Sequence, residues 1–185
     1  MTNHHTALLL IDIQNDYFEG GQLPLNNPKT AADNASAILN AFRQQNWPVI
    51  HIQHENLDAS KPFLLKDSAG QQLHESVTPL HSEVVISKHF PNAFWKTALE
   101  SVLQSMQVNH LVVVGMMTHM CVSTTSRAAM ERGFKVFVVD DACATRSLQY
   151  NGKEIDATTV HNTALAELQM IADVHRTDSI LRYVV

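Results

Sequence analysis

The sequence has few cysteines and no long apolar run. Cys121 and Cys143 are the two cysteines among 185 residues, so at most one disulfide bond can form and a disulfide framework is excluded. The first apolar run, residues 7–11, ends at Asp12 and is too short for a secretory signal. No stretch approaches the ~18 apolar residues of a membrane span. These absences predict a cytoplasmic protein with reduced thiols and no membrane partner.

Basic residues are in the minority. The chain carries 13 Lys and Arg against 18 Asp and Glu, a formal net charge of −5, and it has no basic cluster of the kind that binds phosphate backbones. We therefore expect no nucleic-acid partner. With 45% hydrophobic residues, a chain of this length can bury a sizeable core without disulfides or a structural metal. We expect one domain over residues 1–185.

Short apolar runs alternate with segments of helical periodicity. The runs rich in Val, Ile and Leu are typical of strands buried on both faces, and they span 7–11, 48–52, 84–87, 110–115 and 135–139, with a short last one at 174–175. The helical segments span 30–45, 92–105, 121–132 and 156–172. This order predicts an α/β fold with an open, doubly wound and mostly parallel sheet of about six strands.

The segment 54–81 breaks this alternation because it is long, polar and irregular. Such segments are usually lids, binding loops or contact arms between subunits, and the sequence leaves both interpretations open. Four histidines lie in or near it, namely His51, His54, His74 and His81. No metal-ligand spacing recurs among them, which favours ordinary surface or hydrogen-bonding histidines.

Three reactive side chains follow predicted strands. Ligands of open α/β sheets bind outside the carboxyl ends of the strands, and Asp12, Lys88 and Cys121 follow the first, third and fourth strands. Each signal alone is weak, because turn aspartates, surface lysines and buried cysteines are common. Together they place a base, a positive charge and a thiol nucleophile at one edge. Cys121 begins a predicted helix, whose free N–H groups should lower the pKa of the thiol.

Cys143 is the rival thiol because it also follows a predicted strand. It lacks the flanking polar pattern and a clear helix start, so a buried structural thiol is the favoured interpretation. A redox role ranks last, since no second cysteine lies near Cys121 in the sequence.

Three stretches of the sequence resemble the motifs of the isochorismatase-like cysteine hydrolase family. They are residues 12–18 (DIQNDYF), 88–90 (KHF) and 115–122 (GMMTHMCV), in the family's order and spacing. The resemblance covers residues 7 to about 174, essentially the whole chain. It implies a three-layer α/β/α sandwich around a mostly parallel sheet, and a homo-oligomer, either a dimer or a tetramer.

The same resemblance implies how the site works. It implies a catalytic triad of Asp12, Lys88 and Cys121, and a non-proline cis peptide bond between Met116 and Met117. The backbone N–H groups of Met117 and Cys121 would form an oxyanion hole. Asp12 would take the proton from Cys121, whose thiolate attacks an amide or ureido carbonyl to give a thioester.

Departures from the family's subgroups narrow the reaction. Isochorismatases proper cleave a vinyl ether and lack the cysteine, so Cys121 favours C–N bond hydrolysis. Nicotinamidases carry a metal-binding D-x-H pattern after the second strand, where this chain has QHEN at 53–56. We therefore expect no metal, no cofactor and no nicotinamidase activity. Two alternatives stay open: a family member without turnover, with a binding or structural role, and a vinyl-ether hydrolase.

Four residues in or near the three motifs are candidates for substrate binding. They are Phe18, Trp95, Met116 and His119, and a small-molecule pocket is typically apolar with a few polar groups. Core packing is the competing interpretation of each. The sequence thus predicts a metal-independent amidohydrolase that acts on a small amide or ureide.

Overall fold

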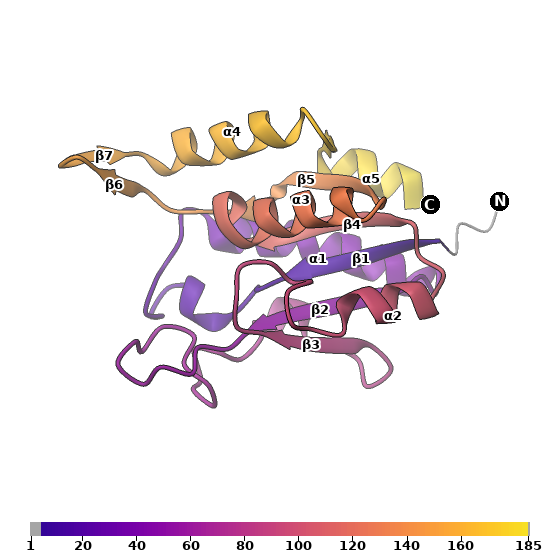
Figure 1. Ribbon diagram of the computed structural model, residues 1–185, viewed down its shortest axis with the longest axis horizontal. Coiled ribbons are helices and arrows are strands. Elements are labelled where there is room, and N and C mark those ends of the chain that lie inside the picture. The colour runs from indigo at the N-terminus through magenta and orange to yellow at the C-terminus, as the bar shows by residue number, and fades with distance from the viewer. Residues whose placement is uncertain (1–4, 185) are drawn as a thin grey trace.

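The computed structural model describes residues 5–184 and contains a six-stranded parallel sheet (Figure 1). Its strands are β1 (Thr6–Ile11), β2 (Val49–His54), β3 (Val84–Lys88), β4 (His110–Met116), β5 (Lys135–Ala144) and β8 (Asp173–His175). Their order in the sheet is β3-β2-β1-β4-β5-β8, and each neighbouring pair is parallel. The predicted strands all form, with β2 and β5 extending further than the apolar runs.

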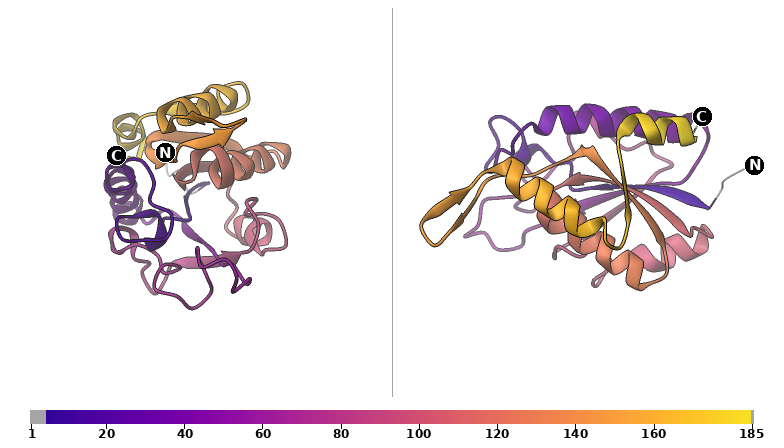
Figure 2. Two further views of the ribbon diagram at one scale, coloured as in Figure 1. Left: turned by 90° about the vertical axis from the view of Figure 1, so that its left-hand side faces the viewer. Right: turned by 90° about the horizontal axis from the view of Figure 1, so that it is seen from above.

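Helices cover both faces of the sheet (Figure 2). One face packs on α1 (Pro28–Gln44) and α5 (Thr177–Val184), and the other on α2 (Leu99–Ser105), α3 (Ser123–Glu131) and α4 (Ala157–Leu168). The alternation along β1 explains the two cores. Leu8 and Leu10 point into the core beneath α1, whereas Leu9 and Ile11 point into the core beneath α2 and α3. The predicted three-layer α/β/α sandwich is confirmed.

The predicted helix 92–105 forms only in its second half, as α2. The Phe94 N–H donates to Asn92 Oδ1, and the Thr97 hydroxyl donates to a backbone carbonyl one turn back. These local side-chain bonds compete with helical ones. Trp95 therefore lies in an irregular turn with 53% of its surface exposed, and not on the apolar stripe of a helix.

One hairpin and one helix were not predicted. The hairpin of β6 (Leu148–Tyr150) and β7 (Lys153–Ile155) projects from one end of the molecule (Figure 1). Its turn residues, Asn151 and Gly152, both have positive φ, so the Asn-Gly pair was the overlooked hairpin signal. The C-terminal helix α5 was also overlooked, and it buries Ile180 and Val184 against α1.

The long segment 54–81 packs along the chain that leaves β1. It contains one short 3₁₀ helix, Glu75–Val77, and a second 3₁₀ helix, Asn15–Tyr17, follows β1. The Asp16 N–H donates to the Gly70 carbonyl, and the His74 N–H donates to the Ile13 carbonyl. A Cβ at Gly70 would overlap the Asp16 carboxylate, so this close approach needs glycine. Within residues 5–184 no helix combines the length and apolarity that a bilayer crossing needs.

Candidate active site

The structure brings together the three side chains predicted from the strand ends. Lys88 Nζ lies 2.7 Å from Asp12 Oδ2 and 3.3 Å from Cys121 Sγ. All three residues are buried, with exposed fractions of 0% for Asp12, 1% for Lys88 and 5% for Cys121. Asp12 follows β1, Lys88 ends β3 and Cys121 follows β4. The acid, the amine and the thiol that the sequence placed at strand ends therefore lie in contact at one site.

The backbone around these residues depends on one close approach between strands. Asp12 leaves β1 with a φ of 51°, in the left-handed region that aspartate tolerates better than most residues. Beside it, Gly115 of β4 pairs with Ile11 at a φ of 128°. A Cβ at Gly115 would overlap the Ile11 carbonyl oxygen. Glycine at this position thus lets β4 pass the end of β1, next to Asp12.

Cys121 lies in a π-helical turn, Thr118–Val122, that leads from β4 into α3. The prediction that Cys121 begins an α-helix was therefore wrong by two residues. The peptide bond between Met116 and Met117 is cis, at the position that the family resemblance gave. The Met117 carbonyl accepts hydrogen bonds from the N–H groups of Met120 and Val122, which closes the turn.

Burial and the neighbouring charges act in different directions on the pKa of the Cys121 thiol. Burial raises its pKa to about 12, the negative charge of Asp12 adds to that increase, and the positive charge of Lys88 opposes it. The predicted lowering of this pKa is wrong, because burial was not visible in the sequence. Burial also acts to lower the pKa of Lys88, but Asp12 and Cys121 outweigh it and raise that pKa. The shifts favour the ammonium form of Lys88 and disfavour the thiolate form of Cys121.

His54 is a fourth member of the cluster that the sequence did not single out as a site residue. It ends β2, and its Nδ1 lies 3.0 Å from Lys88 Nζ. Burial and then the charge of Lys88 lower the pKa of His54 to about 4, so its imidazole is neutral at pH 7. The strand-end rule that identified Lys88 would have found His54 as well. The predicted second strand stopped two residues short of it.

The donor set around Lys88 does not fit a metal ion. Asp12, His54 and Cys121 offer ligand atoms that lie within 4.8 Å of one another. The Lys88 ammonium contacts an atom of each of them, at 2.7, 3.0 and 3.3 Å. A second cation among the same atoms would be repelled by the ammonium at short range in a buried site. Lys88 is thus itself the cation that these donors bind.

The four predicted substrate residues differ in exposure. Phe18 is buried, and its ring stacks on His74 with centroids 3.7 Å apart. Met116 has no exposed surface and packs in the core, which favours packing over substrate contact. Trp95 is exposed and His119 is half-buried, so both keep surface that a ligand could contact. Substrate binding by these four residues stays a prediction.

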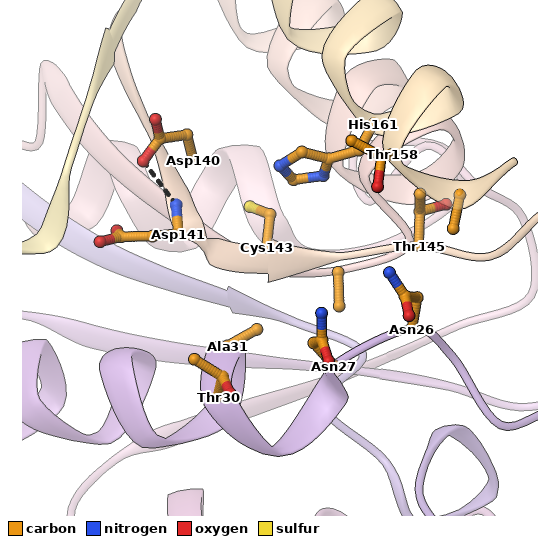
Figure 3. A pocket seen from close by; sticks show the side chains of 12 residues that line it. Asn26, Asn27, Thr30, Ala31, Asp140, Asp141, Cys143, Thr145, Thr158 and His161 are labelled. Carbon is orange, nitrogen blue, oxygen red and sulfur yellow. Dashed lines mark hydrogen bonds between the residues drawn. The ribbon is translucent and has the colours of Figure 1, made fainter.

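Cys143 lies in a separate cavity of about 220 Å³ between β5 and the first turns of α1 and α4 (Figure 3). The thiol of Cys143 and the imidazole of His161 both face this space. Burial raises the pKa of Cys143 to about 12, and the charges of Asp140 and Asp141 add to the increase. Among the described residues that line the cavity, none is a lysine or an arginine. Cys143 therefore lacks the charge partner that Cys121 has.

Comparison with known proteins shows which family the chain belongs to. The family model for the isochorismatase domain matches residues 6–179. The chain is 46% identical to the uncharacterized isochorismatase family protein YddQ of Bacillus subtilis, over 96% of this chain and 99% of that protein. The chain belongs to the isochorismatase family. It is also 35% identical to the secreted isochorismatase effector Isc1 of Verticillium dahliae, over 93% of this chain and 86% of that protein.

Solved structures and enzyme relatives extend the comparison. A protein of Oleispira antarctica assigned to the isochorismatase hydrolases superimposes on this family member with a TM-score of 0.94 and 41% identity, covering 98% of each chain. Nicotinamidase 3 of Arabidopsis thaliana is 29% identical over 85% of this chain and 80% of that protein. The ureidoacrylate amidohydrolase RutB of Klebsiella pneumoniae is 25% identical over 74% of this chain and 72% of that protein. This family member is a hydrolase.

Proposed function

We propose that this family member is a metal-independent cysteine amidohydrolase that cleaves a C–N bond of a small amide or ureide. The observation that carries the proposal is the position of the Lys88 ammonium, 2.7 Å from Asp12 Oδ2 and 3.3 Å from Cys121 Sγ. A buried acid, amine and thiol in contact provide a base, a charge and a nucleophile in one site. The named activities of the nicotinamidase and ureidoacrylate amidohydrolase relatives support an amide or ureide as substrate.

The first half of the reaction forms a thioester. Asp12 takes the proton of the Cys121 thiol while the sulfur attacks the substrate carbonyl carbon, and the Lys88 ammonium stabilises the developing negative charge on sulfur. Burial raises the pKa of the resting thiol, so the attack needs Asp12 as the base that takes this proton. Asp12 then gives the proton to the leaving nitrogen, the C–N bond breaks, and an amine or ammonia leaves.

The second half regenerates the enzyme. Asp12 takes a proton from a water molecule, whose oxygen attacks the thioester carbonyl. The C–S bond breaks, the acid product leaves, and Cys121 recovers its proton. In both halves the carbonyl oxygen becomes negative, and the N–H groups of Met117 and Cys121 would donate to it. Their place in the turn that carries the nucleophile supports this role.

The same proposal includes the substrate contacts, the cellular compartment and the oligomeric state. Trp95 and His119 would contact the substrate, with Phe18 and Met116 forming the apolar wall behind them. Both cysteines are free thiols, which supports a reducing, cytoplasmic compartment. We also propose a homo-oligomer, a dimer or tetramer, on the strength of the family alone.

A hydrolysis screen tests the proposal. Purified protein is incubated with a panel of small primary amides and ureides, and released ammonia is measured for wild type, Cys121→Ala and the matched control Cys143→Ala. We expect at least one compound to be turned over by wild type and by Cys143→Ala but not by Cys121→Ala. Equal turnover by Cys121→Ala would contradict the mechanism.

The screen also includes an enol ether, isochorismate, followed through pyruvate release. The name of the Verticillium relative makes this the natural competitor. Turnover of the enol ether that is independent of Cys121, with no amide hydrolysed, would replace the amidohydrolase with a vinyl-ether hydrolase. No turnover of either class would favour a binding role.

A further inference from the structure

We propose that His54 is a positioning residue that holds the Lys88 ammonium between Asp12 and Cys121. The inference rests on the proposed function of those three residues and adds a fourth, from the end of β2. None of the three sequence motifs contains His54.

The first argument is the hydrogen-bonding capacity of the ammonium. Lysine has three N–H donors and no acceptor. Three acceptor atoms lie around Lys88 Nζ, which are Asp12 Oδ2 at 2.7 Å, His54 Nδ1 at 3.0 Å and Cys121 Sγ at 3.3 Å. Two of these contacts are hydrogen bonds from Nζ, to His54 Nδ1 and to Cys121 Sγ, and the contact with Asp12 is an ion pair. Lys88 is 1% exposed, so losing one acceptor would leave a buried donor without a partner.

The second argument fixes the protonation state of His54. An ammonium only donates, so Nδ1 must accept, and the proton of the neutral imidazole must be on Nε2. The charged and titratable groups that face this imidazole are Lys88, Asp12, His89 and Glu55. Burial and the Lys88 charge keep the ring neutral, with a pKa of about 4. The contact is therefore a hydrogen bond from Lys88 and not a repulsion between two cations.

The third argument is the rigidity of His54 itself. The Gln14 side chain, which is fully buried, accepts from the His54 N–H and donates to the His54 carbonyl, both at 2.9 Å. The same Gln14 amide donates to the Gln71 carbonyl. This clamp ties the end of β2 to the chain that follows β1 and to the segment 54–81. A flexible lysine side chain needs such a fixed partner to keep one position.

The consequence is a defined distance between Lys88 Nζ and Cys121 Sγ. The ammonium opposes the rise in the pKa of the thiol that burial and Asp12 cause. If Lys88 loses its third acceptor, it is free to move or to recruit water, and the thiolate is less stabilised. The reactivity of Cys121 toward an alkylating agent reports this directly and requires no substrate.

The experiment compares two substitutions of His54 in the full chain. His54→Ala removes the acceptor, whereas His54→Asn keeps an oxygen, Oδ1, as many bonds from Cβ as Nδ1 is. Each protein is treated with iodoacetamide over a range of pH, and alkylation of the peptides with Cys121 and Cys143 is followed by mass spectrometry. His110→Ala, at the amino end of β4, is the control for loss of a histidine. Thermal melting checks that every variant is folded.

We expect His54→Ala to slow alkylation of Cys121 about tenfold at pH 8, which corresponds to a rise of about one unit in the pKa of the thiol. His54→Asn and His110→Ala should alkylate at close to the wild-type rate, and Cys143 should be unchanged throughout. A wild-type rate in His54→Ala would overturn the inference. Equal slowing in His54→Ala and His54→Asn would also overturn it, because that result indicates packing alone.

The outcome is separable from that of the proposed function. If the hydrolysis screen shows turnover without Cys121, the amidohydrolase mechanism fails, while the alkylation rates still decide whether His54 positions Lys88. If the screen succeeds and His54→Ala alkylates normally, the mechanism stands and the role of His54 fails.

Discussion

The ion pair between Lys88 and Asp12 makes a quantitative prediction about stability. The charges are 2.7 Å apart, and both side chains have no exposed surface. With an effective dielectric constant of about 20, two unit charges at this distance attract by about 6 kcal/mol. Lys88→Met keeps most of the length of the side chain but leaves the carboxylate buried without its partner. We expect it to lower the free energy of unfolding by about 3–5 kcal/mol.

A double-mutant cycle isolates the pair. Urea denaturation at pH 7, followed by circular dichroism and tryptophan fluorescence, gives the free energy of unfolding of wild type, Lys88→Met, Asp12→Asn and the double variant. Asparagine is chosen because it tolerates the positive φ of Asp12. The double variant should be more stable than Lys88→Met, with a coupling energy of at least about 2 kcal/mol.

An exposed ion pair in the same chain is the matched control. Lys29 Nζ and Asp33 Oδ2 are 2.8 Å apart, but the side chains are 81% and 58% exposed. The cycle of Lys29→Met and Asp33→Asn should give a coupling energy of about 0.5 kcal/mol or less. If the coupling energy of Lys88 and Asp12 were as small as that of the control pair, the prediction of a strong buried ion pair would be refuted.

Three further changes test other parts of the structure. Gly70→Ala should lower the free energy of unfolding by about 3 kcal/mol, because the new Cβ would overlap the Asp16 carboxylate. Gly133→Ala is the control, because its new Cβ meets no neighbour and only the positive φ of this position opposes it. In the same urea titration its free energy of unfolding should fall by only about 1 kcal/mol. Burial acts to raise the pKa of Glu83, but hydrogen bonds, the Arg43 bond first among them, lower it from 4.5 to about 2. The ionised carboxylate therefore stabilises the fold above pH 4.5, and this contribution disappears as the pH falls toward 2. Between pH 4.5 and 2 the free energy of unfolding of Glu83→Gln should therefore fall less steeply with pH than that of wild type. An equal slope for the two proteins would show that the contribution is absent. Trp95→Ala should raise KM while changing the free energy of unfolding by less than about 0.5 kcal/mol, and an unchanged KM would remove Trp95 from the pocket.

The sheet could be predicted because its strands are buried on both faces. A run such as residues 7–11 stays apolar without alternation only where helices cover each side, and all of its residues are buried here. Helix 92–105 was half wrong for a local reason. Its apolar spacing continued through Trp95, but side-chain bonds from Asn92 and Thr97 hold the first half in turns. The spacing of apolar residues does not reveal that side-chain hydrogen bonds compete with those of the helix.

The site could be predicted as far as strand ends reveal it. Asp12 and Lys88 each directly follow a predicted strand, so the rule for parallel sheets found them. His54 was missed because polar residues at the end of β2 hid where that strand stops. The protonation state of Cys121 was also out of reach. It depends on burial by the whole fold and on the distances to Asp12 and Lys88, which no local pattern contains.

Trapping the thioester tests the central claim most directly. Hydroxylamine competes with water for a thioester and converts the acyl group to a hydroxamate, which mass spectrometry detects. With a substrate identified by the screen, wild type and Cys143→Ala should form hydroxamate in proportion to the hydroxylamine added, and Cys121→Ala should form none. Hydrolysis by Cys121→Ala at the wild-type rate, with hydroxamate still produced, would contradict a thioester on Cys121.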